Sequence, residues 1–142
     1  AFIFSSPCNP TGTVYNRSEL EALAAVFERH PQITVISDEI YEYIRFEGKH
    51  ESIASIGQMQ ARTVVVNGLS KGFAMTGWRF GYIAAPLPIA QACVKLQGQF
   101  TSATCSITQK AAIAALTGDL GPSQAMTEAF KRRRSLVVEA LQ

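Results

Sequence analysis

The stretch TVVVNGLSKGFAMTGWRFGYIAA, residues 63–85, decides the fold of this chain. It begins with an apolar run at residues 63–67, which predicts a buried strand, and it ends with a second such run at residues 81–85. Between the two runs lies a single lysine, Lys71, which follows a serine and precedes two glycines and Arg79. A surface lysine needs no such neighbours, so the stretch predicts a polar site at the end of a buried strand.

Two more buried strands are predicted before this stretch, at residues 1–5 and 33–37. Asn16 and Glu19 have the spacing of a capping box, which predicts a helix that runs to about His30. The other predicted helices span residues 88–98, residues 104–117, and Pro122 to the end of the chain. Apolar strands that alternate with helices predict an α/β fold, with three layers (α/β/α) and a mostly parallel sheet.

Composition excludes several classes of function. A net charge of +2, with one short basic run at residues 131–134, does not favour a nucleic-acid partner. No stretch approaches the roughly 20 apolar residues of a membrane span. The cysteines, Cys8, Cys93 and Cys105, are scattered and odd in number, so neither a disulfide framework nor a metal site is predicted. Unpaired cysteines fit a reducing cytoplasm.

Polar side chains follow each of the first three predicted strands. Asn9 comes after the first strand, Asp38 and Tyr41 after the second, and Ser70 and Lys71 after the third. Ligands of open α/β sheets bind at the carboxyl ends of the strands. The sequence therefore predicts a ligand site at this edge of the sheet.

This set of side chains matches what pyridoxal phosphate requires. A lysine can form a Schiff base with the cofactor's aldehyde, an acid can keep the ring nitrogen protonated, and donors can bind the phenolic oxygen and the phosphate. The candidates are Lys71 for the aldehyde, Asp38 for the ring nitrogen, Asn9 and Tyr41 for the phenolic oxygen, and Ser70 and Arg79 for the phosphate. The glycines beside the lysine are expected to let the backbone approach the cofactor. Taken singly, each candidate also has a structural explanation, as a cap, a turn residue or a surface ion pair.

Three motifs together decide between these readings: SPCNPTGTVY at residues 6–15, VISDEIYEYIRF at residues 35–46, and VVNGLSKGFAMTGWRFGYIAAP at residues 65–86. In this order and spacing they resemble the class I and II aminotransferases of fold type I. The stretch KLQGQFTSATCSITQKAA at residues 95–112 adds a resemblance to the bacterial aspartate aminotransferases. The likeness runs from about residue 2 to the end of the chain.

The resemblance implies a role for each candidate. It implies that Lys71 is the Schiff-base lysine and the catalytic base, and that Asp38 pairs with the pyridinium nitrogen. It further implies that Tyr41 and Asn9 bind the phenolic oxygen, with Asn9 also at the substrate carboxylate. Ser70 and Arg79 are then the phosphate ligands.

The resemblance also implies that residues 1–142 are the central part of a larger cofactor-binding domain, because full chains of the family are far longer. The implied function is transfer of an amino group between an amino acid, aspartate, and a 2-oxo acid such as 2-oxoglutarate. The implied assembly is a cytoplasmic homodimer, with residues 97–104 at the interface. Alternatives are an aromatic, alanine or broad-specificity aminotransferase, a lyase of the same fold, a regulatory aminotransferase-like domain, or a fragment without activity.

Overall fold

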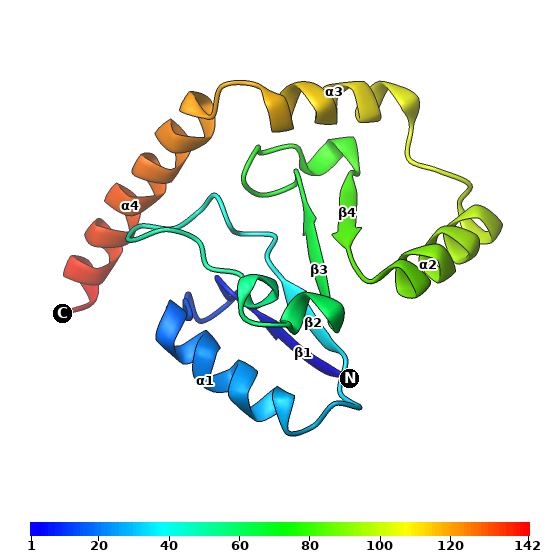
Figure 1. Ribbon diagram of the computed structural model, residues 1–142. Coiled ribbons are helices and arrows are strands. Elements are labelled where there is room, and N and C mark those ends of the chain that lie inside the picture. The colour runs from blue at the N-terminus through cyan, green and yellow to red at the C-terminus, as the bar shows by residue number, and fades with distance from the viewer.

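The computed structural model describes residues 1–142 and is built on one four-stranded sheet in the order β1-β2-β3-β4 (Figure 1). The strands are β1 (Phe2–Ser5), β2 (Val35–Asp38), β3 (Thr63–Gly68) and β4 (Gly81–Ala84). The first three are parallel, and β4 pairs antiparallel with β3. The chain returns from β3 to β4 without a crossover helix, which leaves only antiparallel pairing. The predicted α/β class and mostly parallel sheet are confirmed.

The helices are α1 (Arg17–Glu28), α2 (Leu87–Phe100), α3 (Ser106–Thr117) and α4 (Gly121–Leu141). Each of them was predicted, and the predicted ends differ from the observed ends by a residue or two. Three short 3-10 helices were not predicted: η1 (Ile53–Ser55), η2 (Met59–Ala61) and η3 (Thr76–Trp78). Such short turns carry too few residues to show a helical period.

The predicted capping box at the start of α1 is confirmed. Asn16 Oδ1 accepts a hydrogen bond from the Glu19 backbone N–H at 3.0 Å, and Glu19 Oε2 accepts one from the Asn16 N–H at 2.8 Å. Two N–H groups without helical partners are thereby satisfied, and the helix begins where the sequence predicts.

The hydrophobic core lies between α1, one face of the sheet, and the two turns η1 and η2 (Figure 1). Leu20, Val35 and Ile53 are fully buried there, and Phe27 and Met59 nearly so. Burying such a side chain contributes about 1.5–3 kcal/mol. This core fixes the orientation of β2, and with it the polar turn that follows β2.

Helices α2, α3 and α4 are arranged around the sheet rather than stacked on it (Figure 1). Their apolar side chains stay open to solvent: the exposed fraction is 72% for Val94, 82% for Phe100 and 66% for Leu136. Apolar surface of this extent is typical of a region that packs against further protein. None of the helices is both long and apolar enough to cross a membrane.

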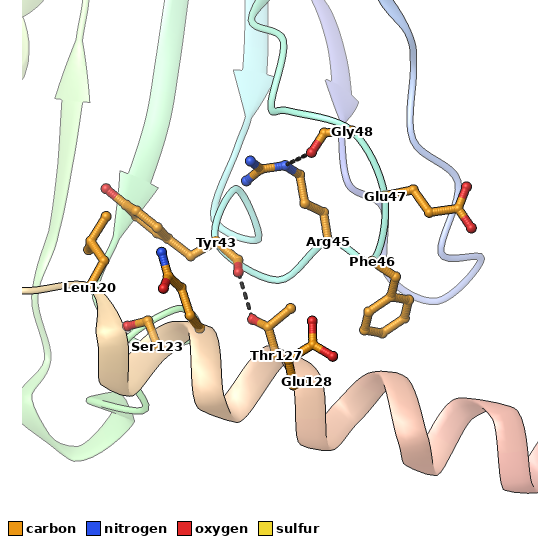
Figure 2. A pocket seen from close by; sticks show the side chains of 10 residues that line it. Tyr43, Arg45, Phe46, Glu47, Gly48, Leu120, Ser123, Thr127 and Glu128 are labelled. Atoms are coloured by element: carbon orange, nitrogen blue, oxygen red, sulfur yellow. Dashed lines mark hydrogen bonds between the residues drawn. The ribbon is translucent and has the colours of Figure 1, made fainter.

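Helix α4 is attached to the loop that follows β2. Thr127 Oγ1 donates a hydrogen bond to the Tyr43 carbonyl at 2.8 Å, and Lys131 Nζ donates one to the Phe46 carbonyl at 3.2 Å. The loop and the helix enclose a hollow of about 410 Å³ (Figure 2). Burial, and then the neighbouring Glu42 carboxylate, raise the pKa of Tyr43 to about 12.

The loops that follow β2 and β3 pack against each other through two aromatic rings beside Lys71. The rings of Tyr43 and Phe73 meet edge to face with their centroids 4.9 Å apart. A Cβ atom at Gly72 would lie 2.8 Å from Cβ and Cδ2 of Tyr43. Gly72 therefore makes room for the Tyr43 side chain, a contact that the sequence did not predict.

We predict that Gly72→Ala lowers the free energy of unfolding of the complete protein by about 1–3 kcal/mol, because the added methyl overpacks the contact with Tyr43. Gly77→Ala is the matched control, since no atom lies within 4 Å of the added Cβ there. Urea denaturation measures both variants. Equal losses of stability would show that the Gly72–Tyr43 contact is not the constraint.

Candidate active site

The three parallel strands carry the predicted site residues to one edge of the sheet. Asn9 follows β1, Asp38 is the last residue of β2, and Lys71 follows β3. In the register of the sheet, Ser5 pairs with Asp38, and Asp38 pairs with Val66. β1 and β2 therefore end level with each other, while β3 continues two residues further, to Gly68. All three strands end at the same edge of the sheet, as the sequence predicts for a site at their carboxyl ends.

Asn9, Tyr41 and Lys71 come together at this edge. Asn9 Nδ2 donates a hydrogen bond to Tyr41 Oη at 3.0 Å, which leaves the phenolic proton of Tyr41 available to another acceptor. Lys71 Nζ lies 5.8 Å from the centroid of the Tyr41 ring. Lys71 is exposed and forms no ion pair within the chain, so no carboxylate competes for its amine.

Asp38 is half-buried, and its carboxylate is only partly used. Oδ1 accepts a hydrogen bond from the Ile40 backbone N–H at 3.1 Å, which fixes the orientation of the side chain. Oδ2 accepts none from this chain. One oxygen of a positioned carboxylate therefore remains to accept a proton donor.

Arg79 lies in a strained backbone conformation between η3 and β4. Its φ is 52°, a left-handed value that costs a residue with a side chain about 1–3 kcal/mol and that recurs at functional sites. Arg79 Nη1 donates to the Thr76 carbonyl at 2.9 Å, and Thr76 Oγ1 donates to the Ser70 carbonyl at 2.9 Å. Thr76 thus links Arg79 to Ser70. No hydrogen bond joins Arg79 or Asp38 to the group of Asn9, Tyr41 and Lys71.

Arg79 also lines an open hollow of about 800 Å³. The opposite wall comes from the connection between α2 and α3, including Thr101 and Thr104. This connection overlaps the segment 97–104, for which the sequence predicts a place at a subunit interface; residues 97–100 of that segment belong to α2. Within one chain it lies next to Arg79.

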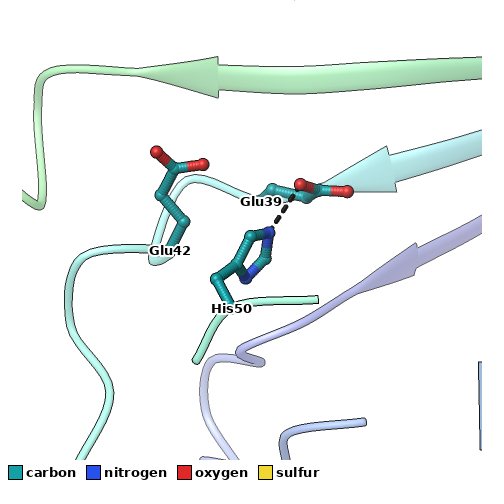
Figure 3. Close-up of side chains that lie close together, drawn as sticks. All are labelled: Glu39, Glu42 and His50. Carbon is teal, nitrogen blue, oxygen red and sulfur yellow. Dashed lines mark hydrogen bonds and ion pairs between the residues drawn. The ribbon is translucent and has the colours of Figure 1, made fainter. Parts of the chain in front are cut away.

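Sequence reasoning missed a second polar group behind the site, made of Glu39, Glu42 and His50 (Figure 3). Its one signal in the sequence is the density of acids in Asp38-Glu39-Ile40-Tyr41-Glu42. Burial raises the pKa of Tyr82 on β4, and the charges of Glu42 and Glu39 raise it further. The negative charge of these glutamates therefore disfavours ionisation of Tyr82 across the edge of the sheet.

Comparison with known proteins identifies the group to which this chain is related. The sequence pattern described as aminotransferase class I and II matches residues 1–142. An aspartate aminotransferase of Pinus pinaster is 49% identical over 144 residues, which cover 99% of this chain and 29% of that protein. An aspartate/prephenate aminotransferase of Cereibacter sphaeroides is 46% identical over 99% of this chain and 36% of its own length.

The structural comparison agrees. The crystal structure of an aromatic aminotransferase from Pyrococcus horikoshii superposes with a TM-score of 0.94 at 42% sequence identity, covering 98% of this chain and 38% of that one. The chain thus spans between 29% and 38% of the length of these relatives. A family match over every residue, relatives with nearly half of their aligned residues identical, and the shared fold confirm the resemblance predicted from the motifs: this chain belongs to the class I and II aminotransferases.

Proposed function

We propose that the complete protein carrying this chain is a pyridoxal-phosphate-dependent aminotransferase that transfers an amino group between aspartate and a 2-oxo acid such as 2-oxoglutarate. The observation that carries the proposal is the meeting of Asn9, Tyr41 and Lys71 at the carboxyl edge of the sheet. The relatives named as aspartate aminotransferases support the choice of substrate.

The polar groups left over at this edge fit the cofactor. Asp38 has one free carboxylate oxygen, Tyr41 has a free phenolic proton, and Lys71 has an amine without an acidic partner. Ser70 has an unused hydroxyl, and Arg79 uses one guanidinium nitrogen on a backbone carbonyl, which leaves further N–H donors. Pyridoxal phosphate presents four groups that match them: a protonated ring nitrogen for Asp38, a phenolic oxygen for Tyr41, an aldehyde for Lys71, and a phosphate for Ser70 and Arg79.

Each residue then has a defined task. Asp38 Oδ2 would accept a hydrogen bond from the ring nitrogen, and its charge would favour the protonated form of that nitrogen. The Tyr41 hydroxyl would donate to the phenolic oxygen, and Asn9 Nδ2 orients Tyr41. The Asn9 side chain would also serve the phenolic oxygen and the substrate carboxylate. Ser70 and Arg79 would bind the phosphate, with Arg79 supplying charge-assisted hydrogen bonds.

When bound, pyridoxal phosphate supplies the aldehyde that holds the substrate amine and the ring that accepts electrons from the reacting carbon. Lys71 does the proton chemistry. Its Nζ, as a neutral amine, would remove the proton from the α-carbon of the amino acid as a general base and would then carry that proton as an ammonium group. The loop that holds Lys71 is packed on Tyr43 through Gly72 and Phe73, so the amine acts from a fixed backbone.

The side chains at this edge would contact the cofactor, and few of them would contact the side chain of the amino-acid substrate. An aromatic aminotransferase is therefore the second candidate, supported by the structural match to the Pyrococcus enzyme. Turnover with a panel of amino acids separates the two: the main proposal requires the highest kcat/KM with aspartate, and a preference for tyrosine or phenylalanine would support the second.

We further propose that residues 1–142 form the central part of the large cofactor-binding domain and that the complete protein is cytoplasmic. The partial coverage of the relatives supports the first point. Three cysteines without disulfide bonds support the second.

We expect the complete protein to be a homodimer, because α2 leaves Val94 and Phe100 open to solvent next to the predicted interface segment, residues 97–104. Sedimentation equilibrium at micromolar concentration should give twice the mass of one chain. A fully active monomer under these conditions would contradict the proposal.

We predict that pyridoxal phosphate is attached to Lys71. Borohydride reduction of the loaded complete protein, followed by peptide mapping, should place the label there and leave Lys95 and Lys110 unlabelled. Lys71→Ala should lower turnover by about 100-fold to 10,000-fold, because it removes the base. A label on another lysine would refute the assignment.

Asp38→Asn should lower kcat by about 100-fold to 1,000-fold, because it removes the charge that keeps the ring nitrogen protonated. Asparagine can still accept the hydrogen bond from the Ile40 N–H, so the unfolding temperature should stay close to that of the wild type. Asp119→Asn is the matched control, since Asp119 Oδ1 accepts the same kind of bond from the Gly121 N–H at 3.0 Å. Near-normal turnover of the Asp38 variant would exclude its role as electrostatic partner of the ring.

A further inference from the structure

The turn after β2 presents charged side chains to two opposite sides. Side chains alternate along a strand, so Ser37 and Glu39 lie on one side and Asp38 on the other. Ser37 and Glu39 are 1% and 3% exposed and belong to the interior, while Asp38 lies at the candidate site. The proposed function uses Asp38 and assigns nothing to its neighbour Glu39.

Glu39 is a buried carboxylate whose two oxygens are fully used. Oε1 accepts hydrogen bonds from Ser37 Oγ at 2.9 Å and Ser52 Oγ at 2.6 Å. Oε2 accepts one from His50 Nε2 at 2.6 Å, since a carboxylate offers no proton to the ring (Figure 3). A buried charge is tolerated only with such partners, so the carboxylate and the segment 50–52 hold each other in place.

The far end of the same turn is attached to β3. Glu42 Oε2 accepts a hydrogen bond from Asn67 Nδ2 at 2.8 Å, and Asn67 Oδ1 accepts one from the Gly68 N–H at 2.7 Å. Gly68 lies three residues before Lys71. Glu42 holds the far end of the turn in place. Loss of the hydrogen bonds of Glu39 would therefore displace the start of the turn, where Asp38 lies.

The group formed by Glu39, Glu42 and His50 does not require a metal ion to satisfy the Glu39 carboxylate. The ligand atoms of Glu39, Glu42 and His50 lie within 4.8 Å of one another, a spacing that a cation could use. Protein donors already occupy both oxygens of Glu39 and one oxygen of Glu42. The carboxylate of Glu39 is therefore satisfied from within the chain.

We infer that Glu39 and His50 are positioning residues: their buried pair fixes the end of β2 so that Asp38 and Tyr41 face the cofactor at the required distance. The inference rests on the proposed function. Neither residue touches substrate or cofactor. A misplacement of catalytic groups by about 1 Å can lower the rate by about 100-fold. Loss of the buried Glu39–His50 pair, one residue from Asp38, is therefore expected to lower the catalytic rate.

The test compares His50→Ala with His50→Gln in the complete protein loaded with pyridoxal phosphate. Glutamine carries an amide nitrogen near the position of Nε2 and keeps a donor for Glu39, whereas alanine removes it. Two readouts are measured: steady-state kinetics, and the midpoint of the pH titration of the bound cofactor's absorbance. The midpoint reports the electrostatic contact of Asp38 and Tyr41 with the ring, which a role in stability alone would not move.

His50→Ala should raise the titration midpoint by about 0.5 pH unit or more, because weaker contacts at the ring nitrogen and the phenolic oxygen both raise the proton affinity of the bound cofactor. It should lower kcat by about tenfold or more with little change in KM, because positioning is lost and substrate contacts are kept. His50→Gln should restore both values toward those of the wild type.

Glu51→Gln is the matched control. Glu51 adjoins His50 in the same segment, but its carboxylate pairs with the exposed side chains of Arg17 and Lys49. The side chains of these two cations are 52% and 79% exposed, so solvent screens both pairs, and this variant should leave the midpoint and kcat unchanged. If His50→Ala does not fold, Ser52→Ala, which removes one donor to Glu39, is measured in its place by the same two readouts.

A variant with a lowered unfolding temperature but a wild-type midpoint and kcat would overturn the inference, as would equal shifts in Glu51→Gln or a failure of His50→Gln to restore function. A wild-type protein that shows no cofactor absorbance would instead refute the proposed function. The two failures are therefore distinguishable.

Discussion

The parallel pairing of β1, β2 and β3 is the constraint on which the rest of the structure depends. The hydrogen bonds of this pairing continue past the ends of the strands: the Ser6 N–H donates to the Asp38 carbonyl at 3.1 Å, and the Glu39 N–H donates to the Val66 carbonyl at 2.9 Å. The chain segments that leave the sheet are thus still held side by side. Parallel strands all end at the same edge, so side chains from distant parts of the sequence meet there.

The two sides of that edge differ in how far their polar groups are satisfied. Behind the site, Glu39 is enclosed by two serines and His50, and a satisfied buried network is rigid. In front, Asp38 and Lys71 keep groups without partners in the chain. A site needs both properties, because free groups bind the ligand and a fixed support holds them at the required distance.

Much of this arrangement could be predicted from the sequence because the deciding signals are local. Apolar runs marked the strands, and Asn16 with Glu19 marked the start of α1, since a cap and its helix are neighbours in the chain. Asn9, Asp38 and Lys71 were predicted to converge because a parallel sheet leaves no other arrangement of its strand ends. The motifs then identified the family, which the comparisons confirmed.

The features that were missed depend on contacts between distant residues. His50 lies 11 residues from Glu39, and nothing in its neighbours reveals a buried partner. The contact of Gly72 with Tyr43 was also missed, because it exists only once two loops have folded together.

The central claim is that one turn positions Asp38 toward the cofactor because Glu39 is anchored behind it. A crystal structure of the complete protein with pyridoxal phosphate tests this claim most directly. The account predicts Lys71 Nζ bonded to the cofactor, Asp38 at hydrogen-bond distance from the ring nitrogen, and Glu39 bonded to His50 in the same molecule. A cofactor attached to another lysine, or a ring nitrogen that faces any group other than Asp38, would contradict it.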